Sequence, residues 1–194
     1  MTLGADYITA EELQNYMGIS DEDAAKYEVA MTDAVGSITE EIIGYCHRDF
    51  NDAGAVSSRQ YRAISHPEYG PMLITDDFHT TVGLVVGSLG VSSLTLEPLN
   101  GIVQGKTGWP YWRIIGSFTP GELVSVTAQW GWASIPKAVR QAAFIWGADT
   151  FQLKDQRLGI AGSDQFGSVI TIKESRAAKA KLRAYRRDSV LVDG

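Results

Sequence analysis

The chain has 194 residues, of which 44% are hydrophobic and 21% are charged, values that are ordinary for a globular protein and exclude wholesale disorder. The net charge of −6 argues against general binding of nucleic acid. No apolar run is long enough to cross a bilayer, and residues 1–10 lack the basic and hydrophobic segments of a secretion signal. We therefore expect one substantial core in a protein that is neither exported nor membrane-spanning.

Two helices are predicted at the beginning of the chain. Thr9 and Glu12 have the spacing of a capping box, which predicts a short helix that runs to about Met17. A second N-cap at Ser20 precedes a longer helix that reaches about His47. The apolar residues of this helix recur every three or four positions and form one stripe: Ala24, Tyr27, Met31, Ala34, Ile38, Ile42 and Tyr45. A helix with such a stripe is expected to pack against partner helices.

The middle of the chain, from about residue 51, is predicted to be rich in β-strands. Gly, Ser, Pro and Asn separate short β-branched and aromatic runs at 59–64, 72–75, 81–86, 111–115 and 123–129. In the last of these runs, apolar and polar residues alternate, as in a half-buried strand. No helical crossover separates the runs, so antiparallel pairing is expected.

Helical patterning returns after Pro136, where proline suits the first turn of a helix. The apolar face of this third long helix extends to about Leu153. Residues 155–168 carry three glycines and are predicted to form a mobile loop. A short strand at 169–172 and a last helix at 174–187 complete the prediction.

The predicted fold class is therefore α+β: a helical bundle of about four helices with a β-rich antiparallel insertion between the second and third long helices. Residues 1–50 and 133–194 are expected to pack together as the bundle. Residues 51–132 are expected to form the insertion.

Charge is distributed unevenly along the chain. Residues 1–52 contain twelve acids and two bases, whereas residues 173–187 contain seven bases and one acid. Four bases of the last helix are spaced to share one face: Arg176, Lys179, Arg183 and Arg186. This face fits a solvated surface, an acidic protein partner or nucleic-acid phosphate.

No catalytic or metal-binding motif is recognisable. Residues 101–107 (GIVQGKT) are similar to a phosphate-binding P-loop, but only three residues separate the glycines where the motif needs four, so a turn before a strand is expected. His47, His66 and His79 lie on different predicted elements, outside metal-ligand spacing of one another or of Cys46. The single cysteine is interpreted as a small core residue. We expect no enzymatic activity, no metal and no cofactor.

Five large aromatic residues crowd into a short stretch near the end of the β-rich region: Trp109, Tyr111, Trp112, Trp130 and Trp132. Core packing would explain them, and so would an interaction surface, because Trp and Tyr are enriched at interface hot spots. Trp112 and Trp130 are expected inside the protein. Trp109, Tyr111 and Trp132 are the candidate interface residues.

Three stretches follow one another in a distinctive order. The first is YITAEEL at 7–13, followed by a long helix that ends in GYCHRDF at 44–50. The second is VSVTAQWG at 124–131, followed by IPKAVRQAA at 135–143, and the third is KLRAYRR at 181–187. In this order the chain resembles the head-to-tail connector, or adaptor, proteins of tailed bacteriophages with long non-contractile tails. The long β-rich middle departs from the compact members of that family.

The resemblance implies a structural virion protein with no catalytic role. It implies a dodecameric ring in the virion neck, assembled in the cytoplasm of the bacterial host. Such a ring joins the portal of the head to the tail-side stopper protein and lets DNA pass through its centre without sequence-specific binding. A ring of this kind needs different surfaces of adjacent copies to meet, and a chain with one acidic and one basic end suits such contacts.

Two sets of charged residues are candidates for these contacts. The basic set, which we expect to dock on the portal or on a neighbouring copy, is Arg176, Lys179, Arg183, Arg186 and Arg187. The acidic set, which we expect to line the DNA channel or a contact between subunits, is Asp33, Glu40 and Glu41.

Other functions are compatible with the same sequence. The chain could be another neck or tail-completion protein, or a binding module whose aromatic β-rich region recognises sugar or peptide. It could also be a small DNA-binding protein that uses the last helix. Size in solution separates the ring from the small modules, and the salt dependence of DNA affinity tests the last alternative.

Overall fold

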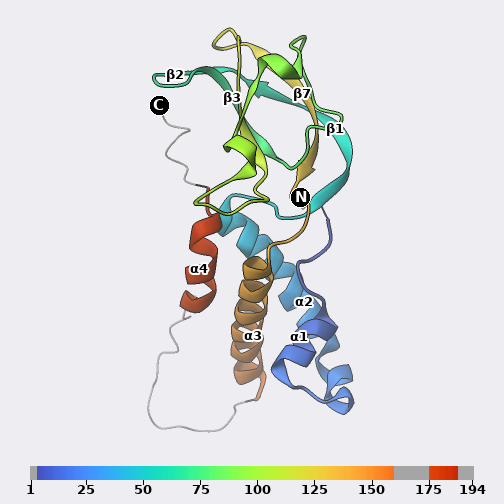
Figure 1. Cartoon of the computed structure of the whole chain (residues 1–194). Helices are drawn as coiled ribbons and strands as arrows, with labels where there is room; N and C mark the ends of the chain where they lie inside the picture. The colour runs from blue at the N-terminus through green and yellow to red at the C-terminus, as the bar shows by residue number, and fades with distance from the viewer. Residues whose placement is uncertain (1–3, 160–174, 188–194) are drawn as a thin grey trace. The chain divides into compact units, whose positions relative to one another are not determined.

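The computed structural model describes residues 4–159 and 175–187 of the chain (Figure 1). Within these ranges the helices are α1 (Ala10–Met17), α2 (Asp21–Cys46), α3 (Lys137–Gly159) and α4 (Arg176–Leu182). The strands are β1 (Asp52–Arg62), β2 (Ile64–His66), β3 (Gly70–Phe78), β4 (Val85–Val86), β5 (Thr95–Glu97), β6 (Tyr111–Ile115) and β7 (Leu123–Gly131). Short 3-10 turns are η1 (Val91–Ser93), η2 (Leu99–Gly101) and η3 (Arg183–Tyr185).

The described residues form two compact units. The β unit comprises residues 4–5 and 48–134, and the helical unit comprises residues 6–47, 135–159 and 175–187. The chain therefore leaves the helical unit after α2 and returns to it before α3.

The predicted fold class was wrong. The described part of the chain is a mixed α/β protein with four helices and a seven-stranded antiparallel sheet, and strands dominate its middle. It is not a helical bundle that carries an insertion, because the strands bury a core of their own around residues such as Leu73, Val126 and Trp130. The predicted runs overlap most of the strands but miss β5 (Thr95–Glu97), and whether the strands bury a common core depends on long-range contacts.

The sheet of the β unit has the strand order β1-β7-β3-β6-β5, with β2 paired to β3 and β4 paired to β7. All of these pairings are antiparallel, as predicted. The alternation predicted for β7 is also confirmed, because one of its faces is buried: Val124, Val126, Ala128 and Trp130.

Several strand boundaries differ from the prediction. The run at 111–115 is strand β6 as expected. The run at 59–64 is divided between the end of β1, a much longer strand that begins at Asp52, and the first residue of β2, Ile64. Most of the run at 81–86 is a turn in which Val85 and Val86 alone pair with β7. The polar residues at 52–58 hide this extension, since β1 is exposed along most of its length.

The helical unit forms around the apolar stripe of α2. Met31, Ala34, Ile38 and Ile42 are at most 4% exposed, as the periodicity predicted. The residues that share this buried core from other helices include Leu13 of α1, Val139, Ala142 and Ala143 of α3, and Leu182 of α4. Cys46 is fully buried, which confirms its interpretation as a core residue.

The capping box at the start of α1 is confirmed. The Thr9 hydroxyl accepts a hydrogen bond from the Glu12 amide at 3.1 Å, and the Glu12 carboxylate accepts one from the Thr9 amide at 3.0 Å. Gly18 ends the helix in the left-handed conformation that glycine adopts without strain. Local side-chain chemistry therefore fixes both ends of α1.

The C-terminal elements depart from the prediction. Helix α3 continues to Gly159, so the first residues of the predicted loop at 155–168 are helical. The rest of that loop and the predicted strand at 169–172 lie outside the described residues. Helix α4 ends at Leu182 and is followed by the 3-10 turn η3, whereas one continuous helix at 174–187 was expected.

Candidate docking surfaces

The candidate basic residues of α4 and of the turn η3 divide into two groups by their surroundings. Arg176 and Arg183 are exposed. Lys179 is half-buried, and its ammonium lies 5.4 Å from the ring centre of Tyr45 and 5.6 Å from that of Trp146. At this distance an ammonium is attracted by the aromatic faces, so Lys179 helps to attach α4 to the rest of the helical unit.

The last two basic residues, Arg186 and Arg187, lie beyond η3. The Arg186 guanidinium lies 5.5 Å from the ring of Tyr45, and the Arg187 amide donates a hydrogen bond to the Cys46 carbonyl at 2.9 Å. The predicted single basic face is therefore interrupted, because the helix ends at Leu182 and a 3-10 turn rotates each residue further than an α-helix does. Arg187 is half-buried and belongs to the packing of this turn.

The exposed side of α4 combines small residues with charge. Ala177 and Ala180 of α4 and Ala184 of η3 are exposed, together with Arg176 of α4 and Arg183 of η3. Ala180 is three or four residues from each of the other four, so the five residues lie on one side of this segment. The opposite side holds two fully buried residues, Ala178 and Leu182. Helix α4 therefore presents a low surface of alanines flanked by two arginines, which we call the outer face of α4.

The acidic candidates all lie on the surface of α2. Asp33, Glu40 and Glu41 are exposed. Asp33 and Glu40 are seven residues apart and share one side of the helix. Desolvation raises the pKa of the Glu41 carboxyl, and the Lys179 ammonium opposes this increase. Glu41 is therefore electrostatically coupled to α4, whereas Asp33 and Glu40 lie on another side of the helix.

A groove of about 370 Å³ lies between α1 and α2. Its lining consists of Ala10, Glu11 and Gln14 of α1 and of Ala25, Glu28, Met31 and Thr32 of α2. Met31 is buried, whereas Glu11 and Glu28 are exposed. Val29, which follows Glu28, is 75% exposed. We call this feature the α1–α2 groove; sequence reasoning missed it, because helical periodicity does not say how closely two helices approach.

Two of the three candidate interface aromatics lie inside the β unit. Trp109 is 9% exposed and Trp132 is 3% exposed, so both contribute to packing and neither forms a surface anchor in the chain. Tyr111 is half-buried and its ring centre lies 5.5 Å from that of Phe78. Trp130 is fully buried as expected, whereas Trp112 is only half-buried.

Trp109, Trp112 and Trp132 surround Arg48, a residue that sequence reasoning did not single out. Arg48 donates hydrogen bonds to both carboxylate oxygens of Asp77, at 3.1 and 3.2 Å, and the Trp132 indole donates to the same carboxylate at 2.9 Å. The guanidinium lies 4.3 Å from the ring of Trp112, 5.5 Å from that of Trp109 and 5.9 Å from that of Trp132. This cluster explains the crowding of tryptophans as the packing of one buried ion pair.

The segment that is similar to a P-loop is a tight turn. The Val103 amide donates a hydrogen bond to the Lys106 carbonyl at 3.0 Å, and the Lys106 amide donates one to the Val103 carbonyl at 2.9 Å. The two residues between them have positive φ. No helix follows, because the chain continues directly to strand β6. The predicted turn is confirmed, and the backbone offers no phosphate cradle at a helix N-terminus.

The histidines are dispersed over the described part of the chain. His47 is exposed, the His66 ring accepts hydrogen bonds from the amides of Glu68 and Tyr69, and His79 lies 4.0 Å from the carboxylate of Asp52. Residues 4–159 and 175–187 contain no cluster of three or more side chains that could hold a metal ion. Among the described helices, none combines the length and the hydropathy needed to cross a membrane.

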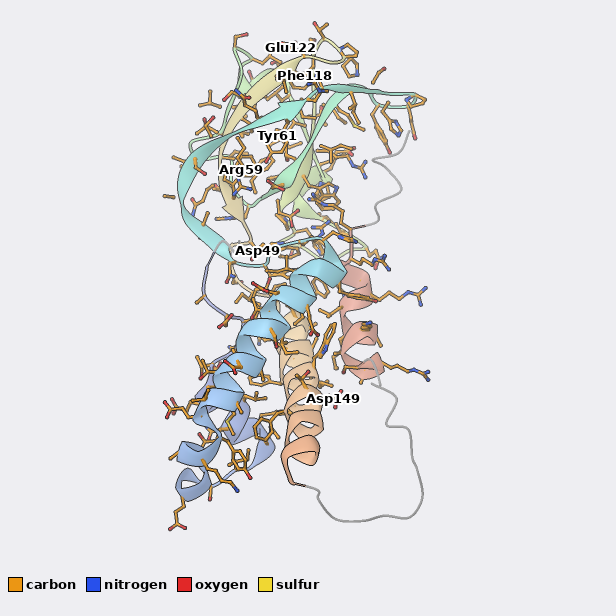
Figure 2. All side chains as sticks on the ribbon, turned by 180° about the vertical axis from the view of Figure 1, so that it is seen from behind. Asp49, Arg59, Tyr61, Phe118, Glu122 and Asp149 are labelled. Atoms are coloured by element: carbon orange, nitrogen blue, oxygen red, sulfur yellow. The ribbon has the colours of Figure 1, made fainter. Side chains whose placement is uncertain are left out.

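Polar side chains of β1 cover the edge of the β core. Arg59 and Tyr61 of β1 (Figure 2) both bond the carboxylate of Asp76, and the Arg59 guanidinium lies 4.7 Å from the ring of Trp130. Burial, followed by the negative charge of Asp76, raises the pKa of the Tyr61 phenol. The phenol therefore stays protonated and donates its hydrogen bond to Asp76. This bond connects β1 to β3.

A second groove, of about 320 Å³, lies within the β unit. It is lined by Glu97, Pro98, Leu99, Ile102, Val103, Trp112 and Arg113. Leu99 and Ile102 are exposed at its edge, and Arg113 forms an ion pair with Glu97 at 3.0 Å. This groove is more apolar than the α1–α2 groove, and its two charged residues neutralise each other.

Comparison of the sequence with models of known protein families gives no match, and comparison with curated proteins gives no significant match.

Proposed function

We propose that the chain is a structural subunit of a bacteriophage virion neck, the head-to-tail adaptor that forms a ring between the portal and the tail-side stopper. The observation that carries the proposal concerns the stretches at 7–13, 135–143 and 181–187. These stretches, on which much of the resemblance to adaptor proteins rests, are far apart in the sequence but belong to one compact helical unit, in which α3 packs against α1, α2 and α4. The β unit is then an elaboration specific to this chain.

The distribution of charge supports a ring. The exposed acids of α1 and α2 and the exposed arginines of α4 lie on different helices of the same unit. A closed ring is built from heterologous contacts, in which two different surfaces of adjacent copies meet. Opposite charge on the two surfaces favours the correct pairing of neighbours and disfavours contacts between identical surfaces.

The acids of α2 also suit a channel for DNA. Asp33 and Glu40 are exposed on one side of the helix. Carboxylates repel phosphate, so a wall that carries them lets DNA pass without binding it. In the proposed ring these residues face the channel, while the portal and the stopper bind at its two ends.

The alternative of a sugar- or peptide-binding module has less support. Such a module would need exposed aromatic residues, and Trp109 and Trp132 are buried around Arg48. Another neck or tail-completion role shares the ring and differs only in the partners.

Assembly with a portal tests the proposal. The purified chain is mixed with the portal protein of the same virus, and the mixture is examined by gradient sedimentation and electron microscopy. We expect the chain to sediment with the portal and to add a ring of density at its tail-side end. A chain that never joins the portal, in a virus whose heads acquire tails without it, would contradict the proposal.

A further inference from the structure

We infer that the α1–α2 groove of one copy receives the outer face of α4 of a second copy. This inference rests on the proposed ring for its biological setting. It concerns, however, the contact between copies and not the contact with the portal, so the two can fail separately.

The groove has the chemistry of a site for a basic helix. Its floor is apolar, with Met31 buried and Ala10 and Ala25 beside it. Two exposed carboxylates, those of Glu11 and Glu28, stand among its lining residues. The next residue of α2, Val29, is 75% exposed and extends the apolar area beyond the groove. An occupant must therefore offer small or apolar side chains flanked by positive charge.

The outer face of α4 meets these requirements. Ala177, Ala180 and Ala184 are exposed and small, so a second helix can approach the α4 backbone closely. Arg176, at the start of α4, and Arg183, the first residue of η3, lie beside this alanine surface, about 10 Å apart along the helix axis. Neither forms a salt bridge within the described residues under a 4.0 Å limit, in contrast to Arg140, which is bound to Glu12. Their guanidinium groups have the charge that the carboxylates of Glu11 and Glu28 require.

The two surfaces cannot satisfy each other within one copy. Helix α3 packs against α4 and also against α1 and α2, and in Figure 1 it lies between α4 and α1. The groove and the outer face of α4 are therefore open at the same time on different sides of the helical unit. When each copy offers both, the contact is heterologous and repeats from copy to copy, which generates a ring if the rotation closes.

A charge exchange between copies tests this contact. Variant one is R176E/R183E, which makes α4 acidic, and variant two is E11K/E28K, which makes the groove basic. The oligomeric state of each is measured by sedimentation velocity over a range of concentrations, both alone and with the portal protein. We expect each variant by itself to associate at least about tenfold more weakly than the wild type, because like charges now meet.

The mixture of the two variants provides the decisive result. In an equimolar mixture, the acidic α4 of variant one fits the basic groove of variant two, and the unaltered α4 of variant two fits the unaltered groove of variant one. We expect the mixture to recover assembly as alternating copies, which also demonstrates that both variants are folded. The control K106E/K137E makes the same change in net charge as variant one, at two exposed lysines outside both surfaces, and should assemble as the wild type does.

The possible outcomes separate the two proposals. Variants that assemble like the wild type, a mixture that fails to recover, or a wild type that forms no oligomer under either condition would overturn the contact. If the wild type and the mixture form rings that do not bind the portal, the contact stands and the adaptor function fails. If all variants bind the portal equally well, the adaptor function stands and the contact fails.

Discussion

Arg48 and Asp77 form an ion pair at 3.1 Å in which the two side chains are only 3% and 4% exposed. Removing two charges from water is costly, and the pair is tolerated only when its geometry is good and further groups satisfy it. Here the Trp132 indole donates to the carboxylate, and the faces of three indoles surround the guanidinium. The pair therefore links the beginning of the β unit to the end of β3 and to the loop before β6.

Replacing Asp77 by alanine should destabilise the β unit severely. The change leaves the Arg48 charge buried without its carboxylate, and the expected loss of unfolding free energy is about 3–5 kcal/mol. Asp76→Ala is the matched control, since Asp76 pairs with Arg59 but is 55% exposed, and its loss should be at most about 1 kcal/mol. Urea unfolding followed by tryptophan fluorescence measures both. Equal losses for the two variants would show that burial does not govern the pair.

The Glu12 carboxylate should make the helical unit sensitive to acid. Its hydrogen bond with Arg140, and then its capping bond with the Thr9 amide, hold the pKa of Glu12 below its ordinary value of 4.5. A group with a lowered folded-state pKa contributes stability that is present above the unfolded-state pKa and disappears as pH falls through the folded-state pKa. The wild type should therefore be more stable than Glu12→Gln at pH 7, and this advantage should vanish below about pH 4.

Unfolding of the two proteins at a series of pH values measures this difference directly. Because Glu12 and Arg140 are both 41% exposed, solvent screening limits the expected advantage at pH 7 to about 1 kcal/mol. Glu11→Gln is the control, since Glu11 neighbours Glu12 but has no part in the capping box. An advantage over Glu12→Gln that stayed constant from pH 7 to pH 3 would rule out the linkage.

Much of the local structure could be predicted because its causes lie within a few residues. The capping box at Thr9 and Glu12, the stripe of α2 and the alternation of β7 depend only on spacing along the chain. The fold class could not be predicted in the same way. Strand β1 pairs with β7, which lies more than sixty residues further along the chain, and no local pattern records that pairing.

The candidate docking surfaces were also predicted only in part, because some of their contacts join residues that are far apart in the sequence. Exposure of Arg176 and Arg183 follows from the amphipathic pattern of the last helix, but the packing of Lys179 against Tyr45 and Trp146 depends on residues brought together by folding. The partner of Arg48 is 29 residues away in the sequence.

Leu182 should be the main anchor of α4. Its side chain is fully buried in the helical unit. Leu182→Ala should lower the free energy of unfolding by about 2–5 kcal/mol, because the truncated side chain leaves a cavity that the short helix cannot fill. Hydrogen exchange of the α4 amides should accelerate before the rest of the unit unfolds, since so short a helix is not stable without its contacts. Arg183→Ala, at the exposed neighbouring position, should leave exchange in α4 nearly unchanged. Unchanged protection in Leu182→Ala would mean that other contacts suffice to hold the helix.

Gly101 should be irreplaceable in the loop before β6. It has a φ of +62°, and a Cβ atom at this position would lie 2.7 Å from the backbone carbonyl oxygen of Trp109. That approach is fixed by the hydrogen bond from the Trp109 amide to the Gly101 carbonyl at 3.1 Å, so the backbone cannot yield without moving Trp109 away from Arg48.

Gly105 provides the matched control for this loop. It also has positive φ, +76°, but no atom lies within 4 Å of its added Cβ, so Gly105→Ala suffers only the conformational strain of about 1 kcal/mol. Gly101→Ala suffers the same strain together with the clash, and it should destabilise the β unit by roughly 1–3 kcal/mol more. Urea unfolding of the two variants measures the difference. If both variants lose the same free energy of unfolding, the contact between Gly101 and Trp109 does not fix the position of this loop beside the Arg48–Asp77 ion pair.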